Sequence, residues 1–306
     1  MNIQDLRKMR DAKSSNMSKI GEAFDKMSNK GYTDDRIWKL STDKAGNGSA
    51  VIRFLPTTVK GDESDELPFV RLYSHGFKNP SNQRWYIENS LTTFNEPDPM
   101  SELNSELWAK GDDKSKDIAR AQKRKLAYYS NILVISDPKN PDNEGKVFLF
   151  KYGTKIMDKI MDKANPTFAE DKPCDVFSPF DGANFKLRQK MVENFPNYDS
   201  SVFDEPSELC GGDEEKMVEV LSSQHLLSTL LDRKNFKTYE ELSKRVDFVM
   251  GRSTKFTQED SVDDSDDVEK EFEQYAKKVA DNEKSAVHKV DTDIDDAEAF
   301  LMSLGD

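Results

Sequence analysis

Short runs of apolar residues, separated by glycine, proline and polar turn residues, occupy much of the chain from Arg36 onward, a pattern typical of strands. The clearest run is Ala50–Leu55, which ends at Pro56 and follows the tight-turn sequence Ala45-Gly46-Asn47-Gly48. Further segments with a strand pattern are Trp38–Leu40, Pro68–Ser74, Arg84–Glu88, Leu126–Ser136, Lys146–Tyr152 and Asn184–Val192. Strands interrupted by long loops favour a barrel or a partly open barrel.

Three segments are predicted to be helices, Thr154–Ala164, Glu214–Leu231 and Tyr239–Met250, and apolar residues of the last keep to one face. The stretch Asn89–Asp112 contains two prolines and many polar residues, so it is predicted to be a loop or an insertion. Residues 1–30 offer little material for a core, but their apolar residues fall near helical spacing and predict a short amphipathic helix.

Composition narrows the class of protein. Hydrophobic residues make up 35% of the 306 residues and charged residues 34%, which favours chain ends that do not fold independently. No apolar stretch is long enough to span a membrane, and Met1–Arg10 has no signal-peptide core. Cys174 and Cys210 are the two cysteines, too few for a disulfide framework or a four-cysteine zinc site. A cytoplasmic location is expected.

The net charge of −13 is concentrated at one end of the chain. The segment from Lys255 to Asp306 holds 17 acidic and 6 basic residues, whereas the first 30 residues hold seven basic and four acidic ones. A basic head, a balanced body and an acidic tail suggest a polyanionic partner and a tail that competes for the same surface. A tail that only improves solubility explains the same charge pattern.

Signatures of enzymes are missing from the sequence. It contains no phosphate-binding G-x-x-x-x-G-K-[ST] motif, and Gly46-Asn47-Gly48 lacks the third glycine of a dinucleotide fingerprint. His75, His225 and His288 are scattered, without a metal-binding H-E-x-x-H motif. We therefore expect no enzyme, although acidic residues gathered by folding could still form a metal-dependent nuclease site.

The strongest chemical signal is Lys123-Arg124-Lys125-Leu126-Ala127-Tyr128-Tyr129, in which three cations lead into a strand with two aromatic rings. Cations neutralise phosphates and exposed rings stack on unpaired bases, so this combination favours single-stranded nucleic acid. Three weaker clusters mix the same residue types: Phe148, Phe150, Lys151 and Tyr152; Arg188, Lys190, Phe195 and Tyr198; and Lys78, Arg84, Trp85 and Tyr86. Because side chains alternate along a strand, about half of these rings should be buried. A virion or scaffold protein that binds no nucleic acid is a further alternative.

These residues resemble a known family, the single-stranded-DNA-binding, helix-destabilising replication protein of T-even-type phages. The resemblance covers roughly residues 36–250. It is carried by Asp43–Gly48 with Ala50–Pro56, His75-Gly76-Phe77-Lys78, Trp85-Tyr86-Ile87-Glu88, Lys123-Arg124-Lys125, Asn131–Val134, Asp137-Pro138, Asn143–Phe148, Gly182–Phe185 and Asn197-Tyr198-Asp199.

The resemblance implies an α+β fold with an OB-fold β-barrel core, helical additions, a flexible basic N-terminal segment and a disordered acidic C-terminal tail. Residues 1–30 would mediate cooperative self-association along DNA, residues 31–252 would bind single-stranded DNA without sequence preference, and residues 253–306 would recruit phage replication and recombination proteins. The implied function is in phage DNA replication, recombination and repair, in the cytoplasm of the infected bacterial host.

The expected binding residues combine the clusters with the family's positions. Those expected at the DNA are Arg53, Lys78, Arg84, Lys123, Arg124, Lys125, Tyr128, Phe150, Lys151, Arg188, Phe195 and Tyr198. Those expected to serve cooperativity are Arg7, Lys8, Arg10, Lys13, Ser14 and Ser15.

The family binds zinc through one histidine and three cysteines, and this chain departs from that pattern. His75 stands at the histidine position, but Asn89–Leu103, where the thiolates would fall, contains no cysteine. A tetrahedral zinc site of this kind needs those thiolates. We therefore expect no cofactor, with packing of the 89–112 segment in place of the metal.

Overall fold

The computed structural model of the protein describes residues 34–168, 170–193 and 195–253. The predicted N-terminal helix, the self-association residues and the acidic tail lie outside these residues. No helix in the described ranges is both long and apolar enough to cross a membrane.

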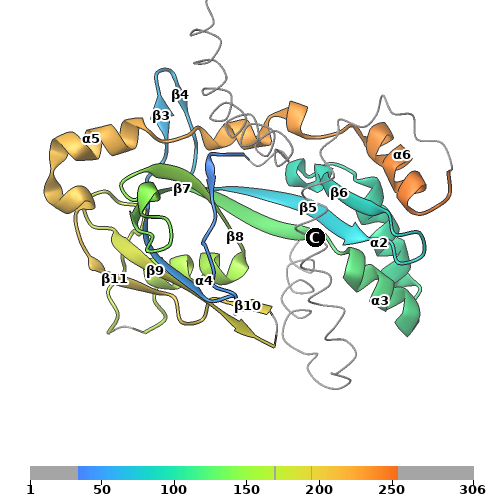
Figure 1. The fold of residues 1–306 in the computed structure, drawn as a ribbon. Helices are drawn as coiled ribbons and strands as arrows, with labels where there is room; N and C mark the ends of the chain where they lie inside the picture. The colour runs from blue at the N-terminus through green and yellow to red at the C-terminus, as the bar shows by residue number, and fades with distance from the viewer. Residues whose placement is uncertain (1–33, 169, 194, 254–306) are drawn as a thin grey trace, which may run out of the picture. The chain divides into compact units, whose positions relative to one another are not determined.

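Most of the predicted strands are confirmed, and they join one nine-stranded sheet (Figure 1). Its path runs β1-β8-β7-β2-β9-β10, with β11 also paired to β9, and with β5 paired to both β6 and β7. The strands are β1 (Ile37–Trp38), β2 (Gly48–Phe54), β5 (Val70–Lys78), β6 (Trp85–Asn89), β7 (Lys125–Ser136), β8 (Val147–Tyr152), β9 (Ala183–Val192), β10 (Phe195–Asn197) and β11 (Val202–Pro206). A separate hairpin consists of β3 (Val59–Lys60) and β4 (Glu63–Ser64).

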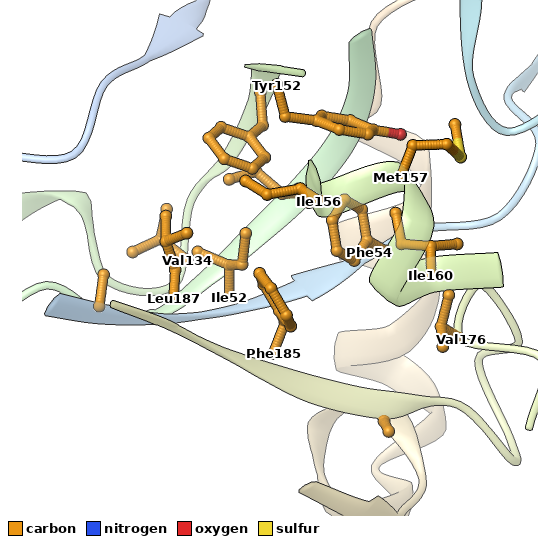
Figure 2. Close-up of a cluster of buried hydrophobic side chains, with 14 of the residues drawn as sticks. Ile52, Phe54, Val134, Tyr152, Ile156, Met157, Ile160, Val176, Phe185 and Leu187 are labelled. Atoms are coloured by element: carbon orange, nitrogen blue, oxygen red, sulfur yellow. The ribbon is translucent and has the colours of Figure 1, made fainter. Parts of the chain in front are cut away.

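One face of β2, β7, β8 and β9 surrounds the largest hydrophobic core (Figure 2). Alternate residues of β2, from Ala50 through Ile52 to Phe54, point into this core, as the strand period of two requires. Helix α4 (Thr154–Ala164), which was predicted with the same bounds, adds Ile156 and Ile160. Residues of four strands and one helix thus meet in a single hydrophobic cluster.

The predicted loop Asn89–Asp112 is wrong, because the segment contains the short helix η1 (Leu91–Phe94) and the helix α2 (Pro99–Ala109). Asp98 caps α2 by accepting hydrogen bonds from the backbone N–H groups of Met100 and Ser101, and Pro99 occupies the first helical position. Pro99, one of the two prolines that suggested a loop, therefore marks the start of a helix. Helix α3 (Asp113–Gln122) follows and leads into β7.

The predicted helix Glu214–Leu231 is only partly correct. Helix α5 (Glu214–Ser222) ends early, and the chain continues through η4 (Leu227–Leu231). Side chains from distant parts of the chain accept hydrogen bonds from the backbone beyond α5. The N–H of His225 donates to Asn131 at 2.9 Å, and the N–H of Leu227 donates to Asp65 at 2.9 Å. These bonds replace helical ones, so the helix stops.

The remaining short helices are η2 (Pro141–Asn143), η3 (Leu209–Gly212) and η5 (Arg233–Asn235). Helix α6 (Tyr239–Val249) confirms the third predicted helix and starts with a capping box between Thr238 and Glu241. It packs with α2, β5 and β6 around a separate cluster of Phe77, Tyr86, Met100, Val246 and Val249.

The mixed α+β class is therefore confirmed for the described residues. Their strand pairs form an open path with branches rather than a closed barrel. β7, the longest strand at 12 residues, pairs with β2 and β8 along one part and with β5 along the other.

Candidate nucleic-acid interface

The Lys123-Arg124-Lys125 triplet lies where α3 ends and β7 begins, and all three residues are exposed. The guanidinium carbon of Arg124 is 4.4 Å from the centre of the Tyr73 ring on β5, a cation–π contact. Crowding by protein atoms lowers the pKa of Lys125, and the nearby cation of Lys151 lowers it further. The triplet thus concentrates positive charge at the corner between a helix and a long strand.

Tyr128 lies next to a second cation. On the antiparallel pair, Tyr128 of β7 stands directly opposite Arg71 of β5, and Leu126 stands opposite Tyr73. Opposite residues share a face of the sheet, and so do residues two apart on one strand. Arg71, Tyr73 and Tyr128 therefore share one face, and the contact of Arg124 with Tyr73 places Arg124 there as well. We call these four residues the Tyr128 surface.

The Tyr128 surface has both features that a bare strand of DNA requires. Arg71 and Arg124 are exposed, while Tyr73 and Tyr128 are half-buried. The Tyr128 ring packs edge-on against Phe69 at 6.0 Å and is stacked on Tyr152 at 5.7 Å between ring centres. Burial raises the pKa of the Tyr128 hydroxyl, whereas the Arg71 cation lowers it. Core rings thus fix Tyr128 while part of it stays accessible to solvent.

Phe150 requires a correction, because it is buried and cannot stack on a base at the surface. It is 6% exposed and contacts Trp38 edge-on, with ring centres 5.6 Å apart. Its partner across the sheet is Ser130 of β7, which lies two residues further into the core than Tyr128. Phe150 is therefore a core residue.

Arg53 requires the same correction. It is 1% exposed, and its Nη2 atom donates to the backbone carbonyls of Ser178 at 3.0 Å and Ser207 at 2.8 Å. Burial lowers the pKa of its guanidinium. The side chain joins the segment before β9 to the segment after β11, so its charge serves the fold and does not reach a phosphate.

Lys125 and Lys151 lie on the face of the sheet opposite to Tyr128. Lys151 of β8 is paired with Tyr129, and its ammonium nitrogen is 5.8 Å from the centre of the Tyr129 ring. Residues 125 and 129 of β7 alternate with residues 126 and 128, so they point the other way. The structure therefore divides these predicted cations between two faces.

Lys78 and Arg84 lie at the turn between β5 and β6, about 16 Å along the strand from Tyr73 at the usual rise per residue. The Lys78 ammonium nitrogen is 5.4 Å from the centre of the Trp85 ring. Arg84 stacks on Phe248 at 3.9 Å and donates to its backbone carbonyl at 2.6 Å. Arg84 thus attaches the hairpin to the end of α6 and lies away from the Tyr128 surface.

The hairpin of β9 and β10 and the residue that follows it hold the last three predicted residues. Phe195 is 52% exposed and Arg188 is also exposed. Tyr198 is half-buried against the main core and donates its hydroxyl to Gln189 at 2.9 Å. In the order of the sheet, β2 lies between this hairpin and β7. DNA contact by these residues stays a prediction.

Two members of the Tyr128 surface, Arg71 and Tyr73, were missed by the sequence reasoning. Both lie within the predicted strand Pro68–Ser74, two residues apart, which puts them on one face. Arg71 and Tyr73 also combine a cation with an aromatic ring on one strand, which is the pattern of the other clusters. What the sequence could not supply was the pairing of this strand with β7.

The residues around His75 do not fit the zinc site that the resemblance implies. His75 is 2% exposed, with Nδ1 3.0 Å from the backbone carbonyl of Gln122 and Nε2 3.2 Å from the Ser101 hydroxyl. Asp98 is engaged by three backbone N–H groups, those of Leu91, Met100 and Ser101. Across the described ranges, no three His, Cys, Asp or Glu side chains are grouped as metal ligands.

A sheet that presents cations and aromatic rings on one face has the arrangement used by proteins that bind single-stranded nucleic acid on a β-sheet. The family model described as "gp32 DNA binding protein like" matches residues 46–250, which is more than half of the chain. The chain belongs to this family.

Three proteins with sequence similarity to this chain come from phages. The chain is 43% identical over 226 residues to a single-stranded DNA-binding protein of Enterobacteria phage T2, covering 71% of each chain. It is 42% identical over 233 residues to the protein of the same name from Enterobacteria phage T4, covering 73% of each. A third relative, from Escherichia phage SV14, is 52% identical over 65 residues, 21% of this chain and 52% of the relative.

Proposed function

We propose that the protein binds single-stranded DNA in phage replication, and that the Tyr128 surface takes part in that binding. The observation that supports this most is the placement of Arg71, Tyr73, Arg124 and Tyr128 on one face of paired strands. The relatives from phages T2 and T4 are named single-stranded DNA-binding proteins.

The proposed binding needs no base-specific contact. Guanidinium groups neutralise phosphates with release of counterions, and each stacked base contributes about 1–3 kcal/mol whatever its identity. Because the rings are accessible only to unpaired bases, the protein favours the single strand over the duplex. Binding then shifts the duplex equilibrium toward open strands by mass action.

Further parts of the proposal rest on the resemblance. The sheet acts as a partly open OB-type barrel, residues 1–30 support cooperative self-association, and the acidic tail recruits replication and recombination proteins. The protein acts in the cytoplasm of the infected host, without covalent chemistry and without a metal. A role in recombination and repair follows from the same partners.

The test is a titration of fluorescent single-stranded oligonucleotides at several salt concentrations. Removing both cations of the Tyr128 surface, Arg71→Ala with Arg124→Ala, should flatten the dependence of log affinity on log salt by about 1.4, at about 0.7 per lost phosphate contact. The matched control removes two exposed cations elsewhere, Lys216→Ala with Lys234→Ala.

An unchanged salt dependence in the Arg71/Arg124 variant, or an equal change in the control, would contradict the placement of the interface. Preference for duplex DNA would contradict the function. Cleavage of the oligonucleotide upon addition of Mg²⁺ would favour the nuclease alternative, and absence of any binding would favour a scaffold protein.

A further inference from the structure

A buried histidine connects three elements beside the basic triplet. His75 lies on β5, and its ring reaches Ser101 on α2 and Gln122 at the last position of α3. It is 2% exposed, and its Nδ1 and Nε2 atoms are 3.0 Å and 3.2 Å from their partners. Both ring nitrogens are therefore engaged within the protein.

The partners determine which nitrogen carries the proton. The partner of Nδ1 is a backbone carbonyl, which can only accept, so Nδ1–H donates to Gln122. In the neutral ring, Nε2 then accepts from the Ser101 hydroxyl. Burial, the largest influence, lowers the pKa of His75 and favours this neutral form.

The carbonyl that His75 holds belongs to the residue just before the triplet. Gln122 ends α3, Lys123 follows as the capping residue, and β7 begins at Lys125. Lys125 is paired with Ser74, the neighbour of His75 on β5. The bond from His75 to Gln122 thus fixes the corner at which the chain turns from helix to strand, and with it the direction in which the triplet leaves.

A second anchor holds the helix that supplies Ser101. Asp98 accepts three backbone hydrogen bonds, at 2.9 to 3.1 Å, from Leu91, Met100 and Ser101. It is 2% exposed and caps α2. Hydrogen bonds within the protein therefore hold the surroundings of His75. Asp98, whose Oδ1 atom is 3.7 Å from Nε2 of His75, could serve as a zinc ligand, but the described residues offer no third His, Cys, Asp or Glu side chain to complete a metal site.

We propose that His75 is a positioning residue for DNA binding, which orients Lys123-Arg124-Lys125 through the Gln122 carbonyl and does so without a metal. This inference rests on the proposed role of the triplet at single-stranded DNA. It assigns to one hydrogen bond the local ordering that the resemblance would assign to zinc.

Two substitutions of similar size test the two hydrogen bonds of His75 separately. His75→Asn places an amide donor near the position of Nδ1 and can keep the bond to Gln122. His75→Gln places its amide near Nε2 and can keep only the bond to Ser101. We expect His75→Gln to weaken binding of a fluorescent oligothymidine about tenfold and to flatten the salt dependence by about 1, while His75→Asn stays within about threefold.

The salt dependence is a readout that general destabilisation does not change, provided that titrations are done well below the melting temperature of each variant. Met217→Ala, in the separate cluster with Leu55, Leu133 and Leu209, is the control for loss of stability. It should lower the melting temperature and leave the salt dependence as it is. Equal binding by the Asn and Gln variants would overturn the proposal.

The coupling to the triplet is tested in a background with Lys123→Ala, Arg124→Ala and Lys125→Ala. If His75 acts through the triplet, His75→Gln has no further effect there, whereas an undiminished tenfold loss would overturn the proposal. If the triple substitution alone leaves binding of the oligothymidine unchanged, this result contradicts the role of the triplet in DNA binding, and with it the role of His75. Stoichiometric zinc in the purified protein, with weaker binding after chelation, would overturn the metal-free part.

Discussion

Tyr128 and Phe150 have similar rings on neighbouring strands and the same face, yet only one is available to a ligand. Tyr128 lies where β7 passes from its pairing with β8 to its pairing with β5, and it is half-buried. Phe150 lies opposite Ser130, one pair deeper, where Trp38 covers it. A step of two residues along β7 thus separates a potential stacking platform from the core.

These two residues should respond differently to substitution. Tyr128→Ala should weaken binding of single-stranded DNA by about 1–3 kcal/mol, the contribution of one stacked base, and should leave sequence preference unchanged. Phe150→Leu should lower the free energy of unfolding by roughly 1 kcal/mol and leave affinity intact. Oligonucleotide titrations and urea unfolding of both variants measure the two quantities. A loss of affinity in Phe150→Leu equal to that in Tyr128→Ala would contradict the assignment.

Arg53 illustrates why a cation on a strand is ambiguous in a sequence. It stands between Ile52 and Phe54 on β2, and alternation places it on the face opposite to theirs. That face is also covered, since Leu55, Leu133, Leu209 and Met217 form a second core there. A strand covered on both faces leaves its arginine no route to solvent. Two backbone carbonyls accept hydrogen bonds from Nη2, while the buried Nε has no hydrogen-bond partner among the described residues.

At the scale of elements, a carboxylate joins the short strand β1 to the turn after β7. Asp137 is 1% exposed and accepts hydrogen bonds from the Trp38 indole at 3.0 Å and from the Asn143 amide at 3.1 Å. Burial pulls the Asp137 pKa upward, but the hydrogen bonds outweigh it, so the pKa lies below its ordinary value. The folded state therefore prefers the ionised carboxylate.

The sign of the pH dependence follows from the lowered pKa. The contribution of Asp137 is complete above the unfolded pKa of about 4 and is lost as pH falls through the lower folded value. Asp137→Asn should lower the free energy of unfolding at pH 7 by about 1–3 kcal/mol, and the difference from the natural protein should shrink below about pH 4. Urea unfolding at a series of pH values checks this.

Asp142→Asn is the control for Asp137→Asn, because Asp142 is an exposed carboxylate in the same turn. It should change stability little at any pH. A stability difference for Asp137→Asn that stays constant down to pH 2 would contradict the role given to ionisation.

At the scale of the whole molecule, the distribution of charge predicts competition between the tail and DNA. The segment 255–306 carries 17 acidic and 6 basic residues, whereas the rest of the chain is nearly neutral. Covalent attachment gives the tail an effective concentration on the order of mM near a basic surface. Deleting residues 255–306 should strengthen binding of single-stranded DNA at low salt, and the gain should fade as salt screens the tail.

Titration of the full chain and the truncated chain over a range of salt concentrations measures this gain. A third protein, in which an uncharged segment of equal length replaces residues 255–306, separates the effect of the tail's charge from that of its bulk. Equal affinities of all three at low salt would show that the tail does not compete.

The local pattern of residues was enough to predict α4, α6 and most strands, because the spacing of their apolar residues sets these elements, and a capping box at its first turn also marks the start of α6. The same pattern carried the family resemblance and the Lys123-Arg124-Lys125 triplet. It failed at Asn89–Asp112, where Pro99 opens a helix that Asp98 caps. It also failed at α5, which ends because the backbone beyond it hydrogen-bonds to Asn131 and Asp65.

Which cations and rings meet was decided only by the tertiary structure. Pairing of β5 with β7 brings Arg71 and Tyr73 to Arg124 and Tyr128, across more than 50 positions of the sequence. Covering of both faces of β2 removes Arg53 from solvent. The physical reason is that the spacing of residues along a strand decides only which side chains share a face. The neighbouring strands and the layers packed on each face decide whether that face meets the core, another strand or solvent.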